Sequence, residues 1–126
     1  MFDNLQVLRM AGGLAWHAAG RQDVIARNIA NADTPGYRAQ DVTPFAEMYR
    51  NGPPMALRTT RPGHFTPTAR EQIGQGAVTG VPSPNGNSVS LEDQMVSAVE
   101  TRQQHDLALT VYKSSLGILR SSLGRR

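Results

Sequence analysis

NIANADTPGY, residues 28–37, decides the fold because a helical pattern of apolar residues stops inside it. Thr34 precedes a proline and is therefore pushed out of the helical region, and the Pro-Gly pair that follows suits the central positions of a type II turn. Asn31 tolerates a left-handed conformation or caps nearby backbone, which favours a helix end at this point. Tyr37 comes next, with a flat ring and a polar tip that suit a half-buried interface. The stretch predicts a fixed exit from an N-terminal helix.

Proline divides the rest of the chain. All eight prolines lie between residues 35 and 84, so two proline-free arms flank a segment that disfavours helices. Asn-Gly occurs twice and Pro-Pro once in this segment, which indicates loops with at most short strands, near 55–60 and 64–66. Three parts are expected within one structural domain: an N-terminal helical arm at 1–34, a turn and Pro/Gly-rich middle at 35–89, and a long C-terminal helix at 90–126.

The C-terminal arm carries the clearest helical signal. Ser90 is a suitable N-cap with Asp93 three residues later, and Gly124 supplies a stop. Between them, mostly apolar residues alternate by four and three, which is the spacing of a coiled-coil seam. The seam positions are Leu91, Met95, Ala98, Arg102, His105, Leu109, Tyr112, Leu116, Leu119 and Leu123. One helix about 50 Å long is expected, at a rise of about 1.5 Å per residue.

The N-terminal arm repeats this spacing with smaller side chains. Its seam positions are Leu8, Ala11, Ala15, Ala18, Gln22, Ile25 and Ile29. Alanines let a partner helix approach closely, but each contact buries little area, so this arm needs a partner to hold it. We expect the two arms to pack antiparallel, giving a mainly α, elongated, coiled-coil-like subunit of two helices. Leu5, Leu14, Val111 and Ile118 would then stay in water and indicate contacts with other subunits.

The composition excludes several classes of site. The chain of 126 residues contains no cysteine, so it forms neither a disulfide nor a thiolate metal site. Its formal charge is +3, but its basic residues are spread along the chain rather than clustered as phosphate binding requires, which argues against a nucleic-acid partner. No stretch is long and apolar enough to span a membrane, and the first residues lack the pattern of a cleaved signal peptide.

Catalytic motifs are also missing. His17, His64 and His105 lie on three different segments, and the sequence contains no nucleophile elbow, phosphate-binding glycine loop, HExxH pair or acidic metal cluster. We therefore expect no enzyme activity, no cofactor and no metal site. A rival hypothesis is a binding module whose amphipathic helices lie on a membrane surface, with Trp16 at the interface. Few basic residues accompany Trp16 on the N-terminal arm, which weakens that alternative.

The stretch at 28–37 closely resembles the signature of bacterial flagellar basal-body rod proteins, and its form is similar to that of the short subunits of the proximal rod. The residues that carry this resemblance are Asn28, Ile29, Ala30, Asn31, Ala32, Asp33, Thr34, Pro35, Gly36 and Tyr37. Two further segments support the resemblance, 85–92 at the start of the C-terminal helix and 61–65 before it. The chain departs from the family pattern at Thr101 and His105, where Asn and Tyr are common.

The resemblance implies a structural subunit rather than an enzyme. Such a subunit would polymerise helically with other copies of itself and with other flagellar rod proteins, forming the drive shaft and the wall of the export channel, and it would be required for flagellum assembly and motility. It would meet the adaptor of the inner-membrane (MS) ring and the type III export gate, and it would lie on the periplasmic side of the basal body after export without signal cleavage. Residues 28–37 would dock on neighbouring subunits. Another short rod protein of the same family is the alternative.

Overall fold

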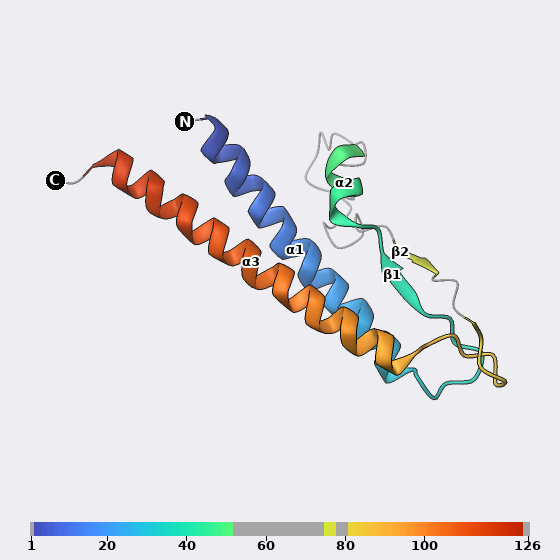
Figure 1. Cartoon of the computed structure of the whole chain (residues 1–126). Coiled ribbons are helices and arrows are strands. Elements are labelled where there is room, and N and C mark those ends of the chain that lie inside the picture. The colour runs from blue at the N-terminus through green and yellow to red at the C-terminus, as the bar shows by residue number, and fades with distance from the viewer. Residues whose placement is uncertain (1, 52–74, 78–80, 125–126) are drawn as a thin grey trace, which may run out of the picture.

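The protein is built on two long helices that lie side by side (Figure 1). The computed structural model describes residues 2–51, 75–77 and 81–124. Its elements in chain order are α1 (Phe2–Ala30), β1 (Gln40–Val42), α2 (Phe45–Asn51), β2 (Gln75–Ala77) and α3 (Leu91–Leu123). The start of α1 and the end of α3 lie at the same end of the pair, so the two helices run antiparallel (Figure 1). The predicted mainly α fold with two packed arms is confirmed.

The C-terminal helix α3 begins and ends where the sequence predicts. Ser90 is in an extended conformation, and its Oγ accepts a hydrogen bond from the N–H of Asp93 at 3.3 Å, which caps the helix. Acidic residues in the first turn and Arg120 in the last turn both match the sign of the helix dipole. Gly124 follows with a φ of 130°, which L side chains rarely adopt. With 33 residues, α3 is about 50 Å long, so the subunit is elongated.

Small side chains form the contact between α1 and α3. The buried residues of α3, spaced by seven, are Thr101, Ala108 and Ser115. Buried residues of α1 at the same spacing are Ala11, Ala18 and Ile25. Residues seven apart lie two turns apart on one face of a helix. Short side chains let the helices approach closely while each buries little apolar area, so the pair has a thin core.

The predicted seam describes this contact on α1, where it contains the buried Ala11, Ala18 and Ile25, but not on α3. On α3 it lies one residue away from the buried stripe, and most of its large side chains face outward. Its exposed members on α3 are Leu91, Met95, Leu109, Tyr112 and Leu123, and its half-buried members there are Leu116 and Leu119. On α1, Ile25 is buried, Leu8 is half-buried and Ile29 is exposed. The physical reason is size, because large side chains would hold the two helices apart and the small ones next to them do not.

A short two-stranded sheet lies along one side of α1 (Figure 1). Strand β1 pairs antiparallel with β2, and Gln40 lies opposite Ala77 while Val42 lies opposite Gln75. Val42 is buried and packs in the core with Val24 of α1. The sheet is therefore fixed to α1 through one apolar contact at the last residue of β1, and polar contacts described below hold the residues before and after it.

The helix α2 is not predicted by the sequence analysis, which expects no helix in the middle segment. The carbonyl of Pro44 accepts a hydrogen bond from the N–H of Glu47 at 3.0 Å, which closes the first turn. A proline at the start of a helix followed by an acidic residue in its first turn is a helix-start signal, and this one was overlooked. The short strands expected near 55–60 and 64–66 lie outside the described residues.

Candidate functional site

The helix α1 ends at Ala30, inside the stretch that the sequence singles out. Asn31 donates from Nδ2 to a backbone carbonyl in the last turn of α1 at 2.8 Å, and its Oδ1 accepts from the hydroxyl of Thr34 at 3.2 Å. The N–H of Tyr37 donates to the carbonyl of Thr34 at 3.3 Å, and Gly36 between them has a φ of 73°. This geometry matches a type II turn with glycine at its third position, as predicted.

Asn28, near the end of α1, is fully buried and uses its whole side chain. Its Nδ2 donates to the backbone carbonyl of Gln40 at 2.6 Å and to Oε1 of Gln94 at 2.9 Å. Its Oδ1 accepts from the backbone N–H of Gln40 at 3.1 Å and from the hydroxyl of Tyr37 at 3.3 Å. The carboxamide thus pairs with β1 much as a neighbouring strand would, and it also joins α1 to α3. Because a buried amide needs its partners, Asn28 requires all these segments to be in place.

Asn87 makes a matching connection from the segment that precedes α3. It is 2% exposed, and its Nδ2 lies 2.7 to 2.9 Å from the carbonyls of Asn31, Ala32 and Thr34. Its two N–H groups are shared among these three acceptors. Its Oδ1 accepts from the N–H of Val89 at 2.7 Å. One side chain from the far end of the middle segment therefore caps the backbone that leaves α1.

Backbone contacts hold the two segments next to each other. The N–H of Ser88 donates to the carbonyl of Tyr37 at 3.0 Å, and the N–H of Gly36 donates to the carbonyl of Asn85 at 3.1 Å. Gly86 has a φ of 81°, and a Cβ placed on it would lie 3.5 Å from the Cα of Gly36. We call the set that joins the exit from α1 to the start of α3 the exit cluster: Asn28, Tyr37, Asn87, Ser88 and Gln94.

Other members of the 28–37 stretch lie on the surface beside the exit cluster. The exposed members are Ile29, Ala30, Asp33, Thr34, Pro35 and Gly36, and the half-buried members are Asn31 and Ala32. The exit cluster fixes their backbone without covering their side chains. Their role in contacts with neighbouring subunits stays a prediction.

Arg21 of α1 and Asp41 of β1 form a bidentate ion pair, with two N···O distances of 2.9 Å. The hydrogen bond to Asp41 raises the pKa of Arg21, burial opposes this, and the charges of Asp41 and Glu100 add to the rise. Burial raises the pKa of the Asp41 carboxyl, but hydrogen bonds from Arg21 and from the N–H of Val42, with the charges of Arg21 and His17, outweigh burial and lower that pKa. The pair therefore holds β1 on α1 at neutral pH.

The two histidines among the described residues, His17 and His105, line different pockets. His17 is buried on α1, its Nε2 lies 2.7 Å from the carbonyl of Thr43, and its ring packs edge-on against Phe45 at 5.7 Å. It is therefore a packing residue below α2, whereas an isolated histidine is expected at the surface or at an interface. His105 is half-buried on α3, and His64 lies outside the described residues.

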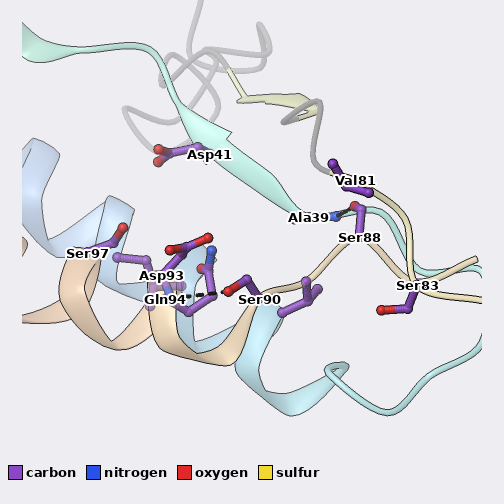
Figure 2. A pocket seen from close by; sticks show the side chains of 11 residues that line it. Ala39, Asp41, Val81, Ser83, Ser88, Ser90, Asp93, Gln94 and Ser97 are labelled. Atoms are coloured by element: carbon purple, nitrogen blue, oxygen red, sulfur yellow. Dashed lines mark hydrogen bonds between the residues drawn. The ribbon is translucent and has the colours of Figure 1, made fainter.

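A pocket of about 460 Å³ lies beside the exit cluster, between β1 and the start of α3 (Figure 2). Its polar lining residues are Asp41, Ser83, Ser88, Ser90, Asp93, Gln94 and Ser97. Inside it, the N–H of Ala39 donates to Oγ of Ser88 at 2.9 Å. Among the described residues that line it, none is a histidine or lysine that could activate a hydroxyl as a nucleophile. Across 2–51, 75–77 and 81–124, no three His, Cys, Asp or Glu residues group as a metal site.

Large apolar side chains of the helix pair face water. Those that are exposed on α1 are Leu5, Met10, Trp16 and Ile29. Those that are exposed on α3 are Leu91, Met95, Val96, Val99, Leu107, Leu109, Tyr112, Ile118 and Leu123. In a globular core the large apolar side chains are buried, whereas in this helix pair many of them are exposed and small side chains are buried. Exposed apolar surface of this extent marks an interaction surface. Of the four residues expected to stay in water, Leu5 and Ile118 are exposed, while Leu14 and Val111 are half-buried.

Sequence reasoning missed the long-range partners in the exit cluster. Gln94 is not singled out by the sequence, and Asn87 and Ser88 enter there only as part of the 85–92 segment. A weak signal is present at Asn28, because an asparagine inside a helix has no local cap to make. An asparagine in such a place calls for a distant partner.

Comparison with known proteins points to the same part of the chain. Residues 15–38, from the middle of α1 through the exit turn, match the family described as flagella basal body rod protein. The chain is 36% identical over 119 residues to the flagellar basal body rod protein FlgB of Agrobacterium fabrum, covering 87% of each chain. The chain belongs to the FlgB family of flagellar basal body rod proteins.

Other FlgB proteins give the same result over somewhat shorter spans. FlgB of Cereibacter sphaeroides is 42% identical over 95 residues, covering 71% of this chain and 73% of the relative. FlgB of Salmonella typhimurium is 31% identical over 109 residues, covering 78% of each. The resemblance to flagellar rod proteins is thus confirmed. In this FlgB-family chain, none of the described helices has the length and apolar character needed to cross a membrane.

Proposed function

We propose that the chain is a structural subunit of the proximal rod of the bacterial flagellar basal body. There it polymerises helically with other copies and with other rod proteins, and it forms part of the drive shaft and of the export channel wall. Membership of the FlgB family supports the place in the rod. The observation that supports polymerisation is the reversed packing of the helix pair, with Ala18 and Ala108 buried while Met95 and Leu109 are exposed.

Burial of the exposed side chains drives the assembly. Apolar surface removed from water contributes about 25 cal/mol per Å², and the thin α1–α3 core leaves much of it unused in a single chain. Contacts between different faces of successive subunits, with a rotation that does not close, generate a helical tube. A thin core also suits export through the type III apparatus, because a marginally stable chain unfolds readily.

The exit cluster gives the subunit a rigid end. Asn28 and Asn87 fix the turn at 33–36 while leaving it exposed, so the turn is presented to neighbours in one conformation. We propose that this turn docks on adjacent subunits, and that the neighbours at the base of the rod are the adaptor of the inner-membrane ring and the type III export gate. The subunit acts on the periplasmic side and carries out no catalysis.

Deletion of the gene in a host with a single copy tests this function. The proposal predicts loss of swimming, with inner-membrane rings present but no rod in isolated basal bodies. The intact gene, supplied in trans, should restore both swimming and rods. Complete basal bodies and normal swimming in the deletion strain would overturn the proposal.

A further inference from the structure

A small pocket opens between α1 and α3 in the middle of the helix pair. Its volume is about 280 Å³, and it is lined by Ala18, Ala19, Gln22, Thr101, Arg102 and His105. No described residue of β1 or α2 contributes to this lining; those elements pack instead against His17 and Arg21. The pocket therefore lies on a part of the helix pair that the described residues of the chain leave open.

The pocket has apolar walls and a cationic rim. The methyl groups of Ala18, Ala19 and Thr101 form the walls, and Arg102 is exposed at the edge with His105 half-buried beside it. Met95 and Leu109 lie seven residues before and after Arg102 and are also exposed, so an apolar stripe continues from the pocket in both directions along α3. A pocket within an apolar stripe is the usual setting of a binding hot spot.

Trp16 is the only tryptophan of the chain and is 42% exposed. It lies on α1 one turn before Ala19, next to the pocket but outside its lining. Side chains of a helix lean toward its N-terminus, so Trp16 leans away from the pocket of its own chain. An exposed indole and an open pocket thus lie next to each other on α1, and within one subunit the indole does not fill the pocket.

We propose that this pocket receives Trp16 of a second copy of the chain. The indole ring would pack on the alanine walls, its π face would meet the Arg102 guanidinium, and its N–H would donate to the amide oxygen of Gln22. A carboxylate would pair with Arg102 but would be desolvated against the apolar walls, which costs free energy. An aliphatic side chain would pack on the walls but would leave Arg102 without an electrostatic partner. The other exposed aromatic side chains of the described residues are Tyr49, which already packs against Phe45 at 5.8 Å, and Tyr112, whose ring binds a cation less well than an indole does.

This contact rests on the proposed function, because it names the residues through which successive copies of the subunit meet. The knob and the pocket are different surfaces of one chain, so each copy offers both. Reciprocal insertion would close a two-fold dimer, whereas the proposed helical rod requires each copy to insert Trp16 into one neighbour and to receive Trp16 from another, which gives a head-to-tail array. The contact would be repeated along the assembly, with Met95 and Leu109 adding apolar area on either side of the pocket.

Cysteine cross-linking tests the contact cleanly, since the chain has no cysteine of its own. Cells carrying the full chain with both Trp16→Cys and Arg102→Cys are treated with a mild oxidant, and the products are separated on a denaturing gel. The matched control carries Trp16→Cys and Leu107→Cys. Leu107 is 59% exposed on α3 but lies about 140° around the helix from Arg102.

The proposal predicts a ladder of covalent multimers for the Trp16→Cys/Arg102→Cys chain, with a cross-linked fraction about tenfold or more above that of the control because a bound contact raises the effective concentration of the two thiols. Equal cross-linking in both chains, or a dimer band without higher multimers, would overturn it.

A second measurement applies if the cysteine chains fail to assemble. The emission of Trp16 in the otherwise unchanged purified chain should shift to shorter wavelength as concentration rises, and Ala19→Gln should abolish that shift; an Ala19→Gln chain that still shifts would also overturn the proposal.

The outcomes separate this contact from the function on which it rests. If the deletion strain lacks rods but the ladder is absent, the pocket assignment is wrong and the rod function stands. If the deletion strain builds complete rods, the rod function fails whatever the cross-linking gives.

Discussion

Replacing Asn28 by alanine should destabilise the fold more than a single buried amide usually does. The substitution removes two hydrogen bonds to the backbone of Gln40, one to Gln94 and one from Tyr37. At about 1 kcal/mol net for each bond, the loss is about 4 kcal/mol. Alanine has a higher helix propensity than asparagine, which offsets about 0.6 kcal/mol of this loss. Gln40 is exposed, so water replaces part of the lost hydrogen bonding to its backbone. We expect a net loss of about 3 kcal/mol, a large part of the stability of a small domain.

The assay is urea unfolding followed by far-ultraviolet circular dichroism, at a concentration where the chain is a monomer, with linear extrapolation to water. Asn31→Ala is the matched control, because Asn31 is half-buried and its side-chain bonds are local, so its loss should cost about 1 kcal/mol or less. A double-mutant cycle with Gln94→Ala should give a coupling of about 1 kcal/mol across the α1–α3 contact. An Asn28→Ala variant no less stable than Asn31→Ala would refute the role assigned to the exit cluster.

Four further predictions follow from the same geometry. Asn87→Ala should lower the free energy of unfolding by about 2 kcal/mol in the same urea assay, since three carbonyls lose their shared donor. Gly36→Ala should lower the free energy of unfolding by about 1 kcal/mol because its φ is +73°, whereas Gly12→Ala, in a helix with open space around it, should raise it by about 0.5 to 1 kcal/mol. Changes of the same sign for the two substitutions would contradict the turn geometry. The pKa of Asp41 is lowered in the fold, so the stabilising effect of its charge is complete at neutral pH and is lost as pH falls from the ordinary aspartate range towards the lowered value. Asp41→Asn should therefore have a lower urea midpoint than the natural chain near pH 7, and the difference between the two midpoints should be smaller at about pH 3. Pro35→Ala combined with Gly36→Ala should reduce swimming more than it reduces the cellular amount of the chain, and normal swimming would count against docking by the exit turn.

Local signals in the sequence were sufficient for the helix boundaries. Ser90 and Gly124 mark the ends of α3, and the Pro-Gly pair marks the turn after α1, because caps and turns depend on residues a few positions apart. The start of α2 after Pro44 carried a signal of the same kind and was overlooked. Each of these features can be read without knowing what lies far along the chain.

The inward face of α3 could not be read in this way, although the predicted seam of α1 contains the buried Ala11, Ala18 and Ile25. On α3, two stripes with the same seven-residue spacing run next to each other, one through Thr101 and Ala108 and one through Arg102 and Leu109. Periodicity favours the more apolar stripe, yet close approach of α1 selects the smaller side chains. The exit cluster was hidden for a related reason, since Asn28 and Gln94 are 66 residues apart and meet only once the helices have packed.

The central claim is that the exposed apolar face of this subunit is covered when the rod forms. A full chain carrying Met95→Cys is expressed in place of the natural one, and its single thiol is labelled with a maleimide reagent in the purified monomer and in isolated basal bodies. The same basal bodies labelled after denaturation give the total. The account predicts rapid labelling of the monomer, where Met95 is 56% exposed, and strong protection in native basal bodies. Equal labelling in the two, or absence of the chain from basal bodies, would contradict it.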